Sequence, residues 1–218
     1  MLSRRALVMA GGSFVLAASP ARAAAMMTDD GYYREDWFLD SFLELADDLK
    51  SAAAGGKQLV VIWEQRGCPY CRDTHLINFA QHDVETYIRD HFEVIELTLH
   101  GSRVVTDFDG EKLGERQLAA KYGVHGTPVI QFFPDKNDLG LKAPREREVN
   151  RIQGYLPPRG FLIMFAFAAD RAYERGSLRD YMRRLSPTAS EVVPGRRVAA
   201  SPEPITTALG GMDSGLAC

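Results

Sequence analysis

Two cysteines, Cys68 and Cys71, stand in the segment EQRGCPYCRD (64–73), directly after the continuous apolar run QLVVIW (58–63). An apolar run of this length predicts a strand that is buried on both faces of a sheet. Pro69 is favoured at the first position of a helix, so we expect a helix to begin at Cys68. One helical turn then separates the two sulfurs and places them on the same side, close enough for a disulfide.

This spacing suits three kinds of chemistry: metal ligation, an inert structural disulfide, or thiol:disulfide exchange. Unpaired N–H groups and the positive end of the helix dipole favour exchange, because they stabilise a thiolate on Cys68. Cys71 is then placed to resolve a mixed disulfide on Cys68. A structural zinc needs four ligands, and the histidines are scattered without a pair at ligand spacing: His75, His82, His91, His100 and His125.

The first 23 residues, MLSRRALVMAGGSFVLAASPARA, have the pattern of an export signal, with paired arginines, an apolar middle and small residues at the end. We expect cleavage after Ala23 by the Sec or the twin-arginine route, with an uncleaved anchor as the alternative. In an oxidising compartment, one close cysteine pair plus Cys218 is a poor disulfide framework. The formal net charge of -3 gives no basic surplus for binding nucleic acid.

Hydrophobic periodicity predicts alternating helices and strands in the rest of the chain. This order predicts a mixed α/β sheet covered by helices on both faces, with the first two strands parallel and the last two antiparallel. We expect an N-terminal extension over 24–35, a domain over 36–185 and a flexible tail over 186–218. The predicted helices are 36–54, 68–79, 83–91, 115–123, 159–174 and 178–185; the predicted strands are 58–63, 92–99, 128–133 and 148–153, with a small hairpin insertion between the second strand and the fourth helix.

A second signal lies in VHGTPV (124–129), where Thr127 and Pro128 open a predicted buried strand. Proline is disfavoured inside a central strand because it cannot donate to the ladder. A cis Thr127–Pro128 bond would turn the chain and bring the Thr127 backbone against the cysteine pair. There it could pair with an extended peptide of a partner protein. A trans proline at a strand entrance is the alternative.

Together, WEQRGCPYCR and VHGTPVIQFF resemble the thioredoxin family, and with the export signal they are most similar to the periplasmic, SoxW-type thioredoxins and to domains of thiol:disulfide interchange proteins. The resemblance covers about 36–185. It implies the thioredoxin fold, with Cys68 as nucleophile, Cys71 as resolving thiol and Pro128 as the cis proline beside them.

The sequence departs from the family's usual pattern in ways that leave its redox potential open. Gly67 replaces the tryptophan before the first cysteine, and the intervening Pro69-Tyr70 is similar to that of glutaredoxins. Ile62 stands where thioredoxins bury an aspartate. Glu64 is the nearest acid; we expect it to be exposed at the strand end, with proton transfer through water as the alternative. Tyr70 either packs over the thiols and a partner or is an incidental exposed aromatic.

The resemblance implies a soluble periplasmic oxidoreductase without metal or organic cofactor, which reduces disulfides of exported partner proteins. It also implies that an inner-membrane thiol carrier of the CcdA or DsbD type supplies the electrons, for use in sulfur oxidation or cytochrome c maturation. Two alternatives remain: a glutaredoxin-like, glutathione-linked reductase, suggested by CPYC, and a peptide-binding module whose cysteines form a structural disulfide.

Overall fold

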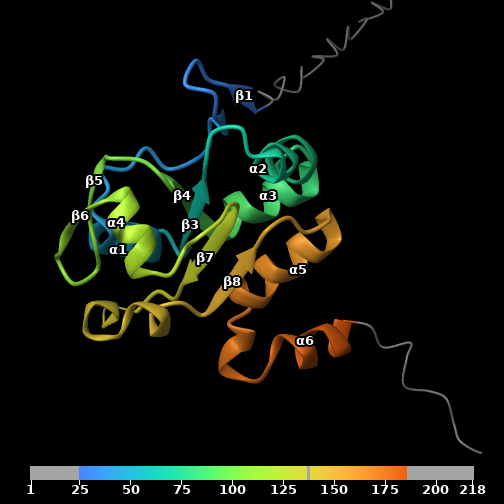
Figure 1. Ribbon diagram of the computed structural model, residues 1–218. Helices are drawn as coiled ribbons and strands as arrows, with labels where there is room; N and C mark the ends of the chain where they lie inside the picture. Colours follow the sequence, from blue (N-terminus) through green and yellow to red (C-terminus); the bar gives the residue numbers. More distant parts are fainter. Residues whose placement is uncertain (1–24, 137, 186–218) are drawn as a thin grey trace, which may run out of the picture.

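The computed structural model describes residues 25–136 and 138–185 and has a four-stranded central sheet covered by helices on both faces (Figure 1). The predicted export signal, the predicted tail and Cys218 lie outside the described residues. Within the described part of the chain, none of the helices combines the length and apolarity that crossing a membrane needs.

The sheet has the strand order β4-β3-β7-β8. β3 (Gln58–Glu64) pairs in parallel with β4 (Phe92–Thr98) and antiparallel with β7 (Val129–Phe133), and β7 pairs antiparallel with β8 (Asn150–Gln153). These pairings confirm the predicted mixed sheet. Every residue of β3 is buried, which is the environment that its continuous apolar sequence predicts.

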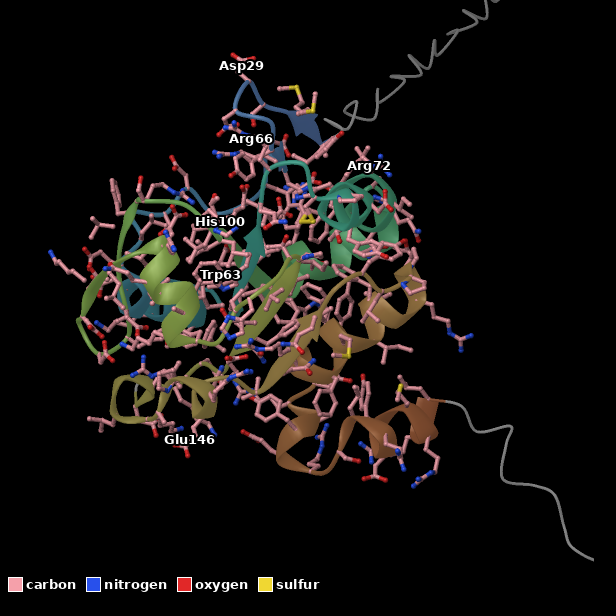
Figure 2. All side chains as sticks on the ribbon, in the orientation of Figure 1. Asp29, Trp63, Arg66, Arg72, His100 and Glu146 are labelled. Atoms are coloured by element: carbon pink, nitrogen blue, oxygen red, sulfur yellow. A yellow bond between two sulfur atoms is a disulfide. The ribbon has the colours of Figure 1, made fainter. Side chains whose placement is uncertain are left out.

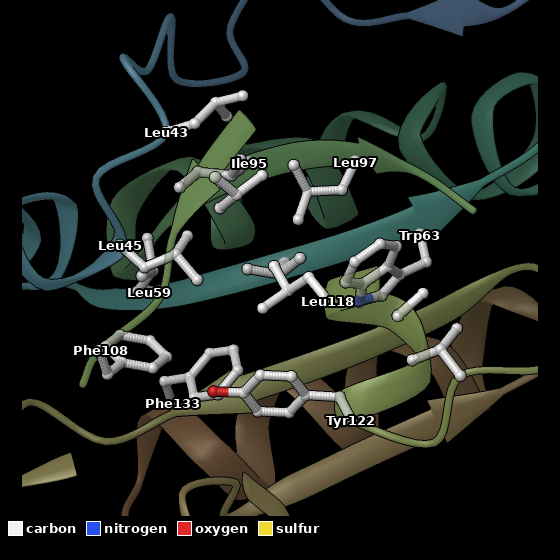
Figure 3. Close-up of a cluster of buried hydrophobic side chains, with 14 of the residues drawn as sticks. Leu43, Leu45, Leu59, Trp63, Ile95, Leu97, Phe108, Leu118, Tyr122 and Phe133 are labelled. Carbon is white, nitrogen blue, oxygen red and sulfur yellow. The ribbon is translucent and has the colours of Figure 1, made fainter. Parts of the chain in front are cut away.

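One face of the sheet packs against α1 (Leu45–Ala54) and α4 (Glu115–Lys121). Because side chains alternate along a strand, Leu59, Val61 and Trp63 of β3 all point to this face. Figure 3 shows this cluster, in which Trp63, Leu118 and Tyr122 fill the space between the sheet and α4.

The other face packs against α3 (His82–His91) and α5 (Pro158–Ala169), and its centre is a set of aromatic rings. The ring of Phe165 lies edge-on to Phe132 and Phe92, with centroids 4.8 Å and 5.2 Å away. A third cluster, which contains Phe167 and Tyr181, holds the short helix α6 (Leu178–Leu185) near α5.

The predicted hairpin insertion is confirmed: β5 (Val104–Thr106) pairs antiparallel with β6 (Lys112–Gly114) around a turn at Gly110. The segment before the predicted domain forms another small hairpin, in which β1 (Met26–Met27) pairs with β2 (Tyr33–Arg34). Figure 1 shows this N-terminal hairpin at the same end of the molecule as α2.

The prediction of one helix over 36–54 is wrong in its first half, because helix α1 begins only at Leu45. The preceding residues run along the sheet edge, where Leu39 N–H donates to the carbonyl of Val94 and Leu43 O accepts from Thr106 N–H. Leu43 has a φ of 61°, which no right-handed helix permits. Consequently Phe42 lies outside the helix and is 96% exposed.

Two further helices differ from the prediction, one in its end and one in its type. The helix expected over 159–174 ends at Ala169, and after Arg171, at φ 49°, the chain forms a single 3-10 turn over Ala172–Glu174. The helix after the cysteines begins as α2 (Pro69–Asp73) and continues as a π-helical segment, Thr74–Phe79. The sequence therefore predicts the extent of the helix after the cysteines, but not that its second part has the wider turn of a π-helix.

Candidate redox site

The cysteine pair lies where the chain leaves the carboxyl end of β3. Gly67 has a φ of 70°, a left-handed conformation that glycine adopts without steric cost and that turns the chain from strand to helix. Cys68 is the residue that caps α2, and Pro69 occupies the first helical turn as predicted. Cys68 and Cys71 form a disulfide, with Cα atoms 5.2 Å apart.

Two backbone groups contact the sulfur of Cys68. The N–H of Cys71 donates to the Cys68 Sγ over 3.1 Å, and the carbonyl oxygen of Thr127 lies 3.6 Å from the same atom. An N–H donor at this position stabilises negative charge on the sulfur once the disulfide is reduced. The Thr127–Pro128 bond is cis, which confirms the prediction, and it places the start of β7 beside the cysteines.

Tyr70 projects from the loop between the cysteines and is 57% exposed. Its ring stacks on that of Tyr155, with centroids 6.2 Å apart and an angle of 14° between the planes. Tyr155 follows β8, next to Gly154, whose N–H donates to the carbonyl of Pro128. Tyr70 is therefore an exposed aromatic that lies against the ring of Tyr155, in the segment that follows β8.

The expectation that Glu64 is exposed is wrong, since only 1% of its surface is accessible. Its Oε1 accepts a hydrogen bond of 2.8 Å from Nε2 of His75, whose Nδ1 bonds Oε1 of Glu35 over 2.9 Å. Glu64 is buried because His75 and the N-terminal segment cover the end of β3. We call Glu35, His75 and Glu64 the buried triad.

Burial alone would lower the pKa of His75, but its hydrogen bonds to Glu35 and Glu64 outweigh burial and raise that pKa to about 9. His75 is therefore an imidazolium at neutral pH, with both ring nitrogens donating. Glu96 on β4 lies nearby: burial and the charge of Glu64 raise its pKa to about 7, against the opposing effect of Arg34.

A pocket of about 230 Å³ opens beside the disulfide. The N-terminal hairpin forms one wall and the cysteine loop the other. Figure 2 shows Arg66 of that loop beside the hairpin that carries Asp29, and Arg72 on α2. Residues that line the pocket include Met27, Tyr32 and Tyr33 from the hairpin, and Glu64, Cys68 and Cys71 from the cysteine side.

The structure thus brings together Glu64, Cys68, Pro69, Tyr70, Cys71, Thr127 and Pro128, the residues that the sequence singles out. Sequence reasoning missed the roles of His75 and Glu35. His75 stands four residues after Cys71, on the same face of one helix, and that spacing was a usable signal. Nothing in the sequence pairs Glu35 with His75.

Several solved structures are similar to this chain at low sequence identity. A thioredoxin-fold protein from Helicobacter pylori is 20% identical, with a TM-score of 0.46, over 62% of this chain and 87% of that chain. A thioredoxin from Thermus thermophilus is 22% identical, with a TM-score of 0.40, over 61% of this chain and 82% of that chain. The oxidised DsbD C-terminal domain of Neisseria meningitidis is 14% identical, with a TM-score of 0.38, over 57% of this chain and 92% of that chain.

Because these identities are low, no function is transferred from those structures. No curated protein matches the sequence. The profile of the thioredoxin-like domain, however, matches residues 45–169, more than half of the chain, and that range contains the central sheet and both cysteines. The chain therefore belongs to the thioredoxin-like domain family.

Proposed function

We propose that this protein is an exported thiol:disulfide oxidoreductase that reduces disulfides of partner proteins through Cys68 and Cys71. The observation that carries the proposal is the environment of Cys68: its sulfur caps α2 by accepting the Cys71 N–H, and it lies 3.6 Å from the Thr127 carbonyl oxygen. The first feature stabilises a thiolate, and the second marks where a partner polypeptide would lie.

In the reduced protein the Cys68 thiolate attacks one sulfur of the partner disulfide, so that a mixed disulfide forms and the partner's other sulfur leaves as a thiolate. Cys71 then loses its proton and attacks the Cys68 sulfur. The Cys68–Cys71 disulfide forms, and the partner leaves with both thiols reduced. Glu64, which lines the pocket with both cysteines, is the candidate acceptor of the Cys71 proton.

The two electrons given to the partner are restored by an external dithiol, for which we propose an inner-membrane carrier of the CcdA or DsbD type. The predicted export signal supports a periplasmic location. The resemblance to SoxW-type thioredoxins supports partners in sulfur oxidation, with cytochrome c maturation as a further destination for the electrons. Thr127 and Pro128 are proposed to hold the partner's extended chain.

Trapping tests this proposal. In a Cys71→Ser variant expressed with its export signal, mixed disulfides with Cys68 cannot be resolved, so partner proteins are expected to accumulate on it and to be released by dithiothreitol. A Cys68→Ser variant is the matched control and should trap none. If the two variants recover the same background proteins, and the wild type does not reduce insulin disulfides with dithiothreitol as donor, the proposal is wrong.

A further inference from the structure

The buried triad joins the segment before the domain to the cysteine pocket. Glu35 follows β2, His75 lies in the π-helical segment after α2, and Glu64 ends β3. The side chains are 5%, 0% and 1% exposed, respectively, so water competes little with the two hydrogen bonds. Three separate parts of the chain thus meet in one buried ionic contact.

The triad is close to the reacting sulfurs. Cys71 and His75 are four residues apart in one continuous helical stretch, so their side chains lie on the same side of it. Glu64 lines the same pocket as Cys68 and Cys71. In this weakly hydrated interior, a change of one charge in the triad acts strongly on a thiolate next to it.

Among the described residues, further charged groups lie near the triad. Glu96 on β4 interacts with both Glu64 and His75, and its own carboxylate lies 3.7 Å from the guanidinium of Arg34. Arg103 also lowers the pKa of Glu96. Three aromatic rings also lie near the His75 ring, with centroids 5.3 to 6.2 Å away: Tyr33, Phe38 and Phe79.

We propose that His75 is a positioning residue of the redox centre: bonded to Glu35 of the N-terminal segment, it holds Glu64 at the pocket and couples its own charge to the charge of the cysteine pair. This inference rests on the proposed function. It makes the N-terminal segment, which the sequence predicts to be an extension, a working part of the site. Reduction of the disulfide then changes the proton affinity of His75, and the protonation of His75 changes the ease of reduction.

The test is a proton NMR titration of His75 in the full chain, with the disulfide oxidised and then reduced by dithiothreitol. A His75→Gln variant assigns the resonance. In the oxidised protein His75 is expected to titrate with a pKa of about 9. In the reduced protein a nearby thiolate should raise that value by roughly half a unit or more. Glu35→Gln, which keeps the size and the acceptor but removes one negative charge, should lower both values by roughly one unit.

The second readout is the equilibrium between the protein and dithiothreitol at pH 7. His75→Gln removes a positive charge near the thiols and should favour the disulfide by about threefold or more. Asp107→Asn is the control, because Asp107 is equally buried but binds Arg147 and Tyr122, away from the pocket. It should change neither the His75 titration nor the equilibrium.

Identical titration of His75 in the two redox states would overturn the inference, as would an unchanged equilibrium in a folded His75→Gln protein. If His75→Gln does not fold, Glu35→Gln decides the question. These results are distinct from failure of the proposed function, in which the wild-type disulfide itself would not exchange with dithiothreitol.

Discussion

The carbonyl oxygen of Thr127 lies 3.6 Å from the sulfur of Cys68, although the two residues are 59 positions apart in the sequence. This contact joins the first turn of α2 to the entrance of β7. Cys68 is 8% exposed and Cys71 is 3% exposed, so the first cysteine is the more accessible of the two.

Alkylation of the reduced protein is expected to follow this order. At pH 7 iodoacetamide should modify Cys68 before Cys71, and faster than it modifies free cysteine, because the Cys71 N–H and the helix start stabilise the Cys68 thiolate. Peptide mass spectrometry measures both rates and separates them from labelling of Cys218. Cys68→Ser is the control. A Cys68 that reacts with the pH dependence of free cysteine contradicts this prediction.

Stability should fall as pH rises through the titration of His75. The pKa of this group is about 9 in the folded protein and 6.5 without its partners. A base whose pKa rises on folding stabilises the folded state below the lower value, and that contribution is lost between the two values. We expect a loss of up to about 3 kcal/mol between pH 6.5 and 9, measured by urea unfolding. A folded His75→Gln variant should lack this loss; an equal loss in the variant would assign it to another group.

Glu96 should give a pH dependence in a lower range. Its pKa rises from 4.5 to about 7 on folding, chiefly because the carboxyl is buried. The neutral form is therefore favoured in the folded protein, and stability is lost as pH rises from 4.5 through 7. Glu96→Gln removes this titration, so the variant should gain stability relative to wild type as the pH increases from 4.5 to 8. Parallel stability curves for the two proteins would refute this.

Arg147 should be a strong determinant of stability with no effect on exchange. Its guanidinium is nearly buried and donates over 2.8 Å to both Asp107 and Asp109. Arg147→Ala leaves the buried carboxylate of Asp107 with fewer partners, which typically costs about 3 kcal/mol or more. The matched control is Arg183→Ala, because Arg183 forms an exposed ion pair with Asp180, and such pairs contribute about 0–1 kcal/mol. Insulin reduction should be unchanged in both variants.

Two phenylalanines offer a matched test of the fold. Phe165 is completely buried among aromatic rings, so Phe165→Ala should lower the free energy of unfolding by about 3–5 kcal/mol. Phe42 is 96% exposed, and Phe42→Ala should change the free energy of unfolding by less than about 0.5 kcal/mol. A large loss in the second variant would mean that residues 36–44 pack as the helix that the sequence predicts.

The fold was predictable because its strongest signals are local. The apolar run before Cys68 predicts a strand buried on both faces, and β3 is such a strand. The helix over 36–44 was wrongly predicted because periodicity reports which residues are apolar, not which face of the sheet they reach: Trp37 and Phe38 pack on one face and Leu45 on the other. The backbone conformation of residues 36–44 is set by hydrogen bonds to β4 and β5. These are long-range contacts, which local sequence does not reveal.

The candidate site was likewise predictable where its signals are local. CPYC and the Thr-Pro pair identify the cysteines and the strand beside them, since each motif has its own physical reason. The burial of Glu64 depends on His75, which bonds it from the helical stretch after the cysteines, and on Glu35, which bonds the other side of His75 from the N-terminal segment. The sequence around a single carboxylate at a strand end does not indicate which residues elsewhere in the chain will bond it.

The N-terminal hairpin and Glu35 precede residue 45, where the match to the family profile begins. A protein shortened to the matched range would keep the sheet, both cysteines and Thr127, and it would still be recognised as a family member. It would also leave His75 with one carboxylate instead of two and the pocket without its outer wall. Biochemistry performed on that shortened protein would describe a different redox centre from the one in the full chain.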